Sequence, residues 1–160
     1  MKTSLSAVFI GAVLAVGALG VASGADLPDP VFGTWKLNLE KSTFGGMPKL
    51  TSQIRTYSRA AEGFTLKMTT VSAEGKATTT QTTYKLDGKD HPSMGNPDFD
   101  SLAGTQIDAN TAEFTLKKAG KPVGRIRRTV SKDGRTLMVN YVLTTADGVQ
   151  TSALSVFDKQ

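Results

Sequence analysis

The side chains best suited to acid–base chemistry lie close together around position 91. His91 is the only histidine of the sequence, and Asp90 and Ser93 lie beside it. A nucleophilic triad needs its three groups to meet in space, whereas neighbouring residues of an extended strand point to opposite faces. The chain also has no cysteine that could act as a nucleophile. We therefore assign no catalytic residue and favour a function other than catalysis.

The same stretch is rich in oxygen ligands that a hard metal ion would accept. Its spacing lacks the glycine at position six and the glutamate at position twelve of a regular calcium loop. Aspartate and asparagine also bend and cap turns, and we favour that interpretation. A haem in a barrel needs only one histidine ligand, so His91 leaves this alternative open, but we expect neither a metal nor a cofactor. The residues concerned are Asp87, Asp90, His91, Asn96, Asp98 and Asp100.

The net charge of +5 raises the question of an anionic partner. The densest basic patch contains Arg125, Arg127 and Arg128. In a strand the first two share one face and Arg128 points to the other. Aromatic residues do not alternate with them, as they would on a surface that binds nucleic acid. We therefore expect no nucleic-acid partner and interpret the charge as a solvated surface.

The N-terminal stretch has the three-part order of a secretory signal peptide. Lys2 supplies a positive charge, residues 7–21 form an uncharged apolar run, and small residues at 22–25 precede Asp26. A helix that spans a membrane needs roughly 20 apolar residues, and this glycine-containing run is shorter. We therefore expect a leader that is cleaved rather than a stable membrane anchor.

This reading divides the chain into a leader, residues 1–25, and a single domain, residues 26–160. Cleavage after Gly24 and cleavage after Ala25 fit the small-residue pattern equally well. No cysteine follows either cleavage position, so a lipid cannot be attached to a cysteine at the start of the mature chain. For the same reason disulfides cannot stabilise the domain. We expect a periplasmic or secreted protein.

The domain shows short alternating runs rather than a helical period. The runs are rich in threonine, valine and aromatic residues, and turns that carry glycine, such as Asp87-Gly88 and Asp133-Gly134, separate them. Sequential hairpins favour an all-β fold, an antiparallel up-and-down barrel of 8–10 strands, because closure removes exposed edges. The expected strands lie near residues 31–38, 51–58, 63–73, 76–86, 89–94, 101–108, 111–118, 122–131, 136–145 and 149–158.

Alternation also assigns the inward face of several strands. In the stretch from Thr78 to Thr83 both faces are polar. These threonines are either ordinary strand residues or the polar wall of an internal cavity. The inward candidates are Phe64, Leu66 and Met68; Ala112, Phe114 and Leu116; Ile126 and Val130; Leu137, Val139, Tyr141 and Leu143; and Leu154 and Val156.

The order of several short motifs resembles that of a known superfamily. Gly33-Thr34-Trp35-Lys36-Leu37 resembles the Gly-x-Trp first strand of the lipocalins and fatty-acid-binding proteins, the calycins. Residues 127–157 resemble the closing three strands of the fatty-acid-binding branch. The chain is also similar to a group of uncharacterised secreted bacterial proteins, through residues 33–38, Lys41-Ser42 and the Gly-Asn-Pro-Asp motif at 95–98. The resemblance implies a closed barrel with a cavity for a small apolar molecule.

The resemblance carries one structural expectation and two departures. In lipocalins the tryptophan packs on an arginine of a late strand, which implies a contact between Trp35 and Arg127 or Arg128. Fatty-acid-binding proteins hold a carboxylate with Arg-x-Tyr on the final strand, but the matching positions here are Ser155 and Phe157. Their two-helix lid is also missing, because residues 39–50 are too short and glycine-rich for it.

These observations predict an exported, monomeric, lipocalin-like protein that binds a small apolar or amphipathic ligand inside the barrel. Two alternatives stay open: a filled barrel that acts as a structural or protein-interaction module, and a barrel enzyme that uses the Asp90-His91 loop. The candidate ligand-binding residues are Tyr57, Phe64, Leu66, Met68, Tyr84, Phe114, Leu116, Ile126, Arg127, Val139 and Tyr141.

Overall fold

The structure is a computed structural model that describes residues 29–94, 96, 98–144 and 147–160. The leader expected at residues 1–25 lies outside the described residues. Ten strands and no helix occur in the described part, as the all-β prediction requires. The strands are β1 (Gly33–Thr43), β2 (Leu50–Arg59), β3 (Phe64–Ser72), β4 (Ala77–Tyr84), β5 (Asp87–Pro92), β6 (Ser101–Asp108), β7 (Thr111–Lys118), β8 (Lys121–Val130), β9 (Thr136–Thr144) and β10 (Gln150–Lys159).

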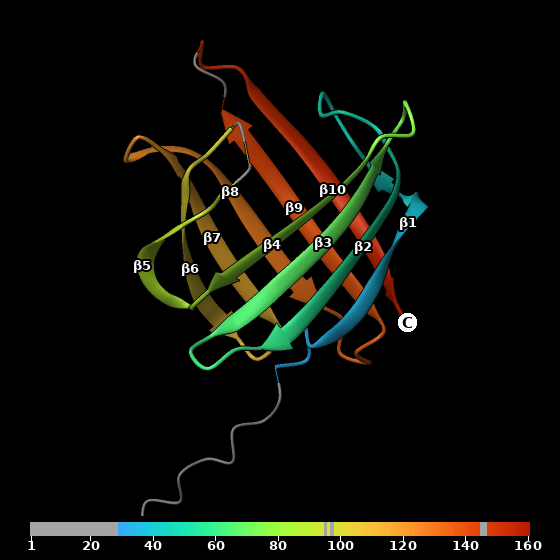
Figure 1. The fold of residues 1–160 in the computed structure, drawn as a ribbon, viewed down its shortest axis with the longest axis horizontal. Helices are drawn as coiled ribbons and strands as arrows, with labels where there is room; N and C mark the ends of the chain where they lie inside the picture. Colours follow the sequence, from blue (N-terminus) through green and yellow to red (C-terminus); the bar gives the residue numbers. More distant parts are fainter. Residues whose placement is uncertain (1–28, 95, 97, 145–146) are drawn as a thin grey trace, which may run out of the picture.

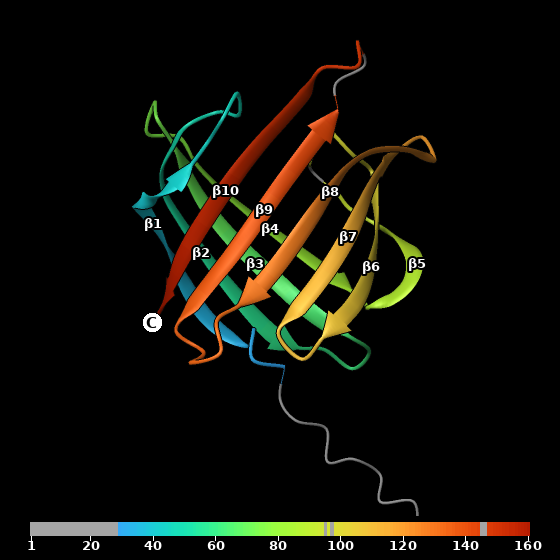
Figure 2. The same cartoon turned by 180° about the vertical axis from the view of Figure 1, so that it is seen from behind.

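The strands form one antiparallel sheet in the order β4-β3-β2-β1-β10-β9-β8-β7-β6-β5. The sheet curls around on itself into an up-and-down barrel (Figures 1 and 2), which confirms the predicted architecture. Closure is incomplete, because β4 and β5 share no ladder among the described residues. The barrel therefore keeps two sheet edges, where the sequence predicted none.

The first strand is longer than predicted and bends. Its pairing with β10 shifts between Asn38 and Thr43, whereas its pairing with β2 ends at Lys36. Ser42 stabilises the bend: its Oγ donates to the Asn38 carbonyl (2.6 Å) and accepts from the Val156 amide (2.9 Å). The strand then leads through residues 44–49 into β2 without a helix, which agrees with the missing lid.

Trp35 is fully buried in the core of the barrel. Its indole Nε1 donates to the Val31 carbonyl oxygen at 2.7 Å. The expected arginine contact is wrong, because the cation over this ring is Lys159, whose Nζ lies 4.8 Å from the ring centroid. Arg127 lies on the outer face of β8, and the guanidinium of Arg128 is held by aromatic rings of the barrel interior.

The register of β10 corrects one face assignment. Phe157 is fully buried in the core and lies opposite Leu137 of β9, so Phe157 and Ser155 point inward. Leu154 and Val156 therefore lie on the opposite face of the strand, where Val156 is nevertheless buried. Apolar residues occur in both phases of this strand, so alternation alone cannot decide between the two faces.

Candidate functional site

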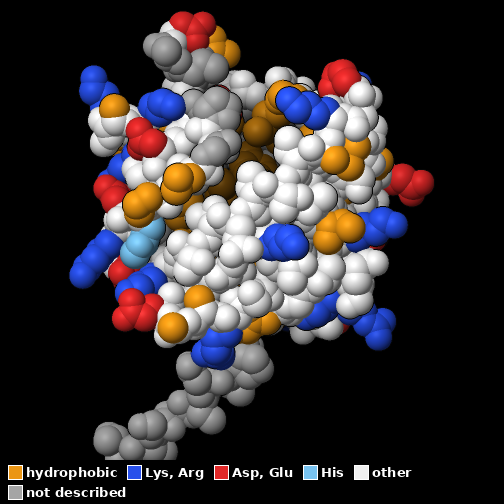
Figure 3. Space-filling view, in the orientation of Figure 1, with side chains coloured by type: hydrophobic (Ala, Val, Ile, Leu, Met, Phe, Trp, Pro, Cys, Tyr) orange, Lys and Arg blue, Asp and Glu red, His pale blue; other side chains and the backbone are white. Residues whose placement is uncertain are grey.

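The interior of the barrel contains a cavity of about 170 Å³. Figure 3 shows the surface hollowed on one face, with hydrophobic side chains visible inside. The described residues that line it include no aspartate or glutamate. Its apolar lining is Leu66, Met68, Met94, Phe99, Leu102, Phe114, Ile126 and Val139, and its polar lining is Arg55, Tyr57, Thr80, Thr82, Tyr84, Ser93, Asn96, Arg128 and Tyr141.

Three neighbouring strands present part of this lining in rows. Because cross-strand partners share a face, the register of β2, β3 and β4 sets side chains from all three strands next to one another. The first row is Arg55, Met68 and Thr80, and the second is Tyr57, Leu66 and Thr82.

The threonines of strand β4 have different surroundings on the two faces of the sheet. Thr80 and Thr82 line the cavity, so the polar wall considered for this stretch is present. On the outer face Thr79 and Thr83 form hydrogen bonds with threonines of β3, at 3.1 and 2.8 Å. The same residue type therefore lines the interior and stabilises the sheet.

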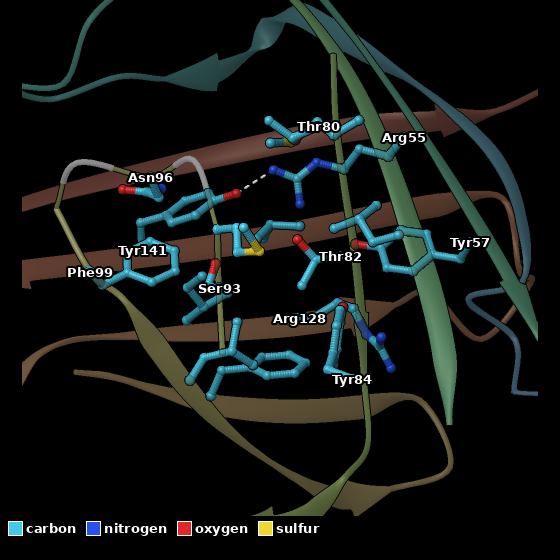
Figure 4. Close-up of a pocket in the computed structure, with 17 residues that line it drawn as sticks. Arg55, Tyr57, Thr80, Thr82, Tyr84, Ser93, Asn96, Phe99, Arg128 and Tyr141 are labelled. Atoms are coloured by element: carbon cyan, nitrogen blue, oxygen red, sulfur yellow. Dashed lines mark hydrogen bonds between the residues drawn. The ribbon is translucent and has the colours of Figure 1, made fainter. Parts of the chain in front are cut away.

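Arg55 is the most consequential residue of the cavity. Its side chain is buried (5% exposed), and its guanidinium lies 4.7 Å from the centroid of the Phe157 ring. Its Nε donates to Gln53 Oε1 at 2.9 Å, and Nη2 donates to the Tyr141 hydroxyl. Figure 4 shows this second bond inside the cavity. No carboxylate of the described residues forms an ion pair with Arg55.

The charge of Arg55 is maintained despite its burial. Burial acts to lower the pKa of Arg55, but electrostatic interactions and hydrogen bonds with the Tyr141 and Tyr57 side chains outweigh it, and the pKa is raised above its ordinary value. A guanidinium is protonated at any physiological pH even without such help. The cavity therefore holds a permanent positive charge.

Arg128, the second buried arginine, has its own counter-ion. Its Nη2 donates to Asp29 Oδ2 at 3.2 Å, and the guanidinium lies 5.2 to 5.8 Å from the centroids of three rings, Tyr57, Phe64 and Phe114. Nε and Nη1 have no hydrogen-bond partner among the described residues. Since Asp29 balances Arg128, the uncompensated charge of the interior is that of Arg55.

The phenol of Tyr84 adds no negative charge to this site. Burial, followed by the neighbouring Tyr57, raises the pKa of Tyr84, and Arg128 and Arg55 oppose the rise only in part. Its ring packs edge-on against Phe64 at 4.2 Å and Phe114 at 5.4 Å between centroids. Tyr84 therefore contributes a neutral hydroxyl group to the cavity, and its ring is packed against the rings of Phe64 and Phe114.

The structure brings together most of the predicted ligand-binding residues. Phe64 and Leu116 are buried in the core but do not line the cavity. That any of the predicted residues contacts a ligand stays a prediction. The eight that line the cavity are Tyr57, Leu66, Met68, Tyr84, Phe114, Ile126, Val139 and Tyr141.

Arg127 is the one predicted residue that faces away from the cavity. Its Nη1 lies 2.7 Å from Glu113 Oε1 on the outside of the barrel. Because Ile126 and Arg128 line the cavity, alternation along β8 requires Arg127 to point outward. The interior cation that sequence reasoning missed is Arg55. It lies two positions before Tyr57 on the same face of β2, and this spacing could have found it.

His91 lies outside the cavity lining. Its Nε2 is 2.8 Å from Asp87 Oδ1 on β5, and Asp90 on the same strand pairs with Lys117 of β7 at 2.7 Å. Within the described part of the chain, no three or more acidic or histidine side chains are close enough to hold a metal ion. Nor does that part contain a helix with the length and apolar character to cross a membrane.

The comparisons with known proteins identify the fold. No protein-family model matches the chain, and no curated protein does. Solved structures do match. As-p18, an extracellular fatty acid binding protein, is 17% identical with a TM-score of 0.56, over 84% of this chain and 99% of that protein. The chain has the calycin fold. The resemblance to the uncharacterised bacterial group stays a prediction.

Two further structures lead to the same fold. Zebrafish ileal bile acid-binding protein, complexed with cholic acid, is 12% identical with a TM-score of 0.52, over 82% of this chain and 99% of that protein. A Schistosoma mansoni fatty acid binding protein in complex with arachidonic acid is 14% identical with a TM-score of 0.50, over 82% of this chain and 96% of that protein. At these identities the calycin likeness concerns the fold alone.

Proposed function

We propose that this calycin barrel binds a small amphipathic anion, with the apolar part in the cavity and the anionic head at Arg55. The observation that carries the proposal is a buried arginine that lines the cavity with no carboxylate partner among the described residues. An isolated charge is expensive to bury, and a partner of opposite sign recovers much of that cost. A bound anion would supply this partner.

The rest of the lining fits such a molecule. Leu66, Met68, Ile126 and Val139 offer apolar walls, which supply most of the affinity in cavities of this kind. A carboxylate can accept two parallel hydrogen bonds from a guanidinium, and it is the head group that we propose for Arg55. The similar structures include proteins that bind cholic acid and arachidonic acid.

The proposed head-group site differs from the one that the family resemblance implies. The Arg-x-Tyr positions of the last strand are Ser155 and Phe157, and Phe157 lies under the Arg55 guanidinium instead. The cation therefore comes from β2, and Tyr141 of β9 supplies the phenol.

The cavity is also the reason why we prefer a binding protein to a filled barrel.

In this proposal the protein is exported and binds its ligand outside the cytoplasm. Export rests on the signal-peptide pattern of residues 1–25. The test is the intact mass of the protein recovered from the periplasm or medium of an expressing cell. A chain that begins at Ala25 or Asp26 is expected, and a protein that keeps its leader in the cytoplasm would contradict export.

The binding proposal is tested with two ligands that differ only in their head group. Calorimetry measures the affinity for a medium-chain carboxylate and for the alcohol of the same chain length. Wild-type protein is expected to prefer the carboxylate, and Arg55→Met to lower that affinity at least about tenfold while alcohol binding is kept. Arg127→Met, which removes an arginine from the outer face, is the matched control.

The outcomes separate the parts of the proposal. If neither ligand binds the wild type, a cavity for amphipathic molecules of this size is wrong. If both bind but Arg55→Met weakens them equally, the head group does not lie at Arg55. If Arg127→Met reproduces the loss, the preference reflects the net charge of the protein rather than the cavity.

A further inference from the structure

Gln53 holds the side chain of Arg55 at its Nε atom. It lies two positions before Arg55 on β2, so the two side chains share one face of the strand, and it is buried (6% exposed). Its Oε1 accepts the hydrogen bond from Arg55 Nε at 2.9 Å. Gln53 is not among the residues that line the cavity. Its effect on a ligand would therefore act through Arg55.

The partners of the Gln53 amide leave it only one orientation. A guanidinium donates hydrogen bonds and accepts none, so the amide oxygen must face Arg55. The amide nitrogen then faces Thr70, which lies opposite Gln53 in the β2–β3 ladder, and donates to Thr70 Oγ1 at 2.9 Å. A continuous chain of hydrogen bonds therefore runs from β3 through Gln53 to the guanidinium.

Among the described residues, the side chains that bond to the Arg55 guanidinium are all neutral. Gln53 is an amide. Tyr141 and Tyr57 are phenols, which are uncharged at physiological pH. These groups satisfy donors that would be costly to leave alone. They supply no negative charge, so the positive charge of Arg55 stays open to a ligand.

A carboxylate at position 53 would fit as well as the amide does. Glutamate has the length and shape of glutamine, and one of its oxygens would accept from Arg55 Nε. The Thr70 hydroxyl would turn and donate to the other oxygen, because a hydroxyl both donates and accepts. Arg55 would then have an internal counter-ion, as Arg128 has in Asp29. The amide at this position is thus what leaves Arg55 without one.

We infer that Gln53 is a positioning residue that sets the charge preference of the cavity. It fixes the guanidinium through Nε, and because it is neutral it does not weaken the attraction between Arg55 and an anion. The inference rests on the proposed function, since it concerns the ligand at Arg55. It predicts that one change from amide to carboxylate converts an anion site into one without a preference for anions.

The test compares Gln53→Glu with the wild type, using the medium-chain carboxylate and the alcohol of the same chain length. Calorimetry measures both affinities, and circular dichroism confirms that the variant is folded. The carboxylate affinity should fall at least about tenfold, while the alcohol affinity is kept. A loss of packing alone would weaken both ligands. Gln150→Glu, at an exposed position of β10, changes the net charge equally and should keep the wild-type preference.

A second measurement follows the Arg55 Nε–H group without any ligand. Its NMR signal is identified by its absence from Arg55→Met. The bond to Gln53 should slow exchange of this hydrogen with water, so Gln53→Leu, which removes the acceptor, should speed the exchange at least about tenfold. Gln53→Glu should keep the slow exchange, because a carboxylate also accepts the bond.

The outcomes separate the inference from the proposed function. If the wild type prefers the carboxylate and Arg55→Met loses that preference but Gln53→Glu keeps it, the inference is wrong and the proposed function stands. If the wild type shows no preference, the proposed function fails and the inference fails with it. Equal Nε–H exchange in the wild type and Gln53→Leu, or a loss of preference in Gln150→Glu, also overturns the inference.

Discussion

Arg55 and Tyr141 meet inside the barrel, where the guanidinium Nη2 of Arg55 donates a hydrogen bond to the Tyr141 hydroxyl. The two residues come from β2 and β9, which β1 and β10 separate in the sheet. The phenol oxygen satisfies a charged donor that would be costly to leave alone. It does not neutralise the charge, so an anion still gains by approaching Arg55.

The first prediction concerns Tyr141→Phe. This change removes the acceptor and leaves a buried charged donor without it, so the free energy of unfolding should fall by about 1–3 kcal/mol. A bound carboxylate supplies the missing acceptor, so it should raise the thermal midpoint more in the variant than in the wild type. Thermal unfolding with and without a medium-chain carboxylate measures both effects. An equal rise of the thermal midpoint in the two proteins would contradict the idea that the carboxylate replaces the Tyr141 hydroxyl as an acceptor for Arg55.

The second prediction concerns the counter-ion of Arg128. Asp29→Asn keeps a side-chain oxygen for the Val31 amide, which lies 3.0 Å from Asp29 Oδ1, but removes the charge that balances a buried guanidinium. We expect the free energy of unfolding to fall by about 1–3 kcal/mol, measured by urea denaturation.

The matched control is the corresponding change in an exposed pair. Glu113 pairs with Arg127 on the outer face, and such pairs contribute about 0–1 kcal/mol. Glu113→Gln should therefore cost less than Asp29→Asn. Equal losses would mean that Asp29 does not act as a buried counter-ion.

Most of the fold could be predicted because one signal repeats along the chain. Glycine turns and alternation locate strands locally, and short connections make neighbouring strands pair. The length of β1 could not be predicted in this way, because its bend depends on Ser42, which bonds to both β1 and β10. The incomplete closure was also missed, since the gap between β4 and β5 is a property of the whole sheet.

The candidate site was predictable for its apolar walls and less so for its charges. Phe114 follows from alternation because the other face of β7 is polar, and Val139 follows because it shares a phase with Leu137 and Leu143, the more apolar phase of β9. Where both phases of a strand hold arginines, as at Arg127 and Arg128, the pattern does not choose between them. Arg55 was missed because an arginine in a strand is usually exposed, and its burial depends on partners from other strands, Tyr141 and Phe157.

The third prediction is a dependence of stability on acid pH. Hydrogen bonds from the Ser131 side chain and then from the Arg135 backbone amide lower the pKa of Asp133 below its ordinary 3.8. A carboxyl group with a lower pKa in the folded state contributes stability that is present above its unfolded-state pKa. That stability is lost as the pH falls through the folded-state pKa.

The free energy of unfolding should therefore decrease as the pH falls below about 4, and Asp133→Asn should flatten the decrease. Urea denaturation at a series of acid pH values measures the slope. Ser131→Ala removes the first of the two donors and should raise the pKa of Asp133 in an NMR titration. An unchanged pKa in that variant would show that the turn does not set it.

The last prediction compares two glycines that are close to other atoms of the barrel. A Cβ added at Gly124 would lie 2.5 Å from the backbone oxygen of Val142 on β9, whereas one at Gly104 would first meet the Phe114 ring at 2.7 Å. A paired strand cannot shift away as a side chain can, so Gly124→Ala should lower the free energy of unfolding by about 1–3 kcal/mol, and by more than Gly104→Ala. Urea denaturation of both variants tests the order, and a larger loss for Gly104→Ala would show that the Phe114 ring is held more rigidly than the β8–β9 ladder.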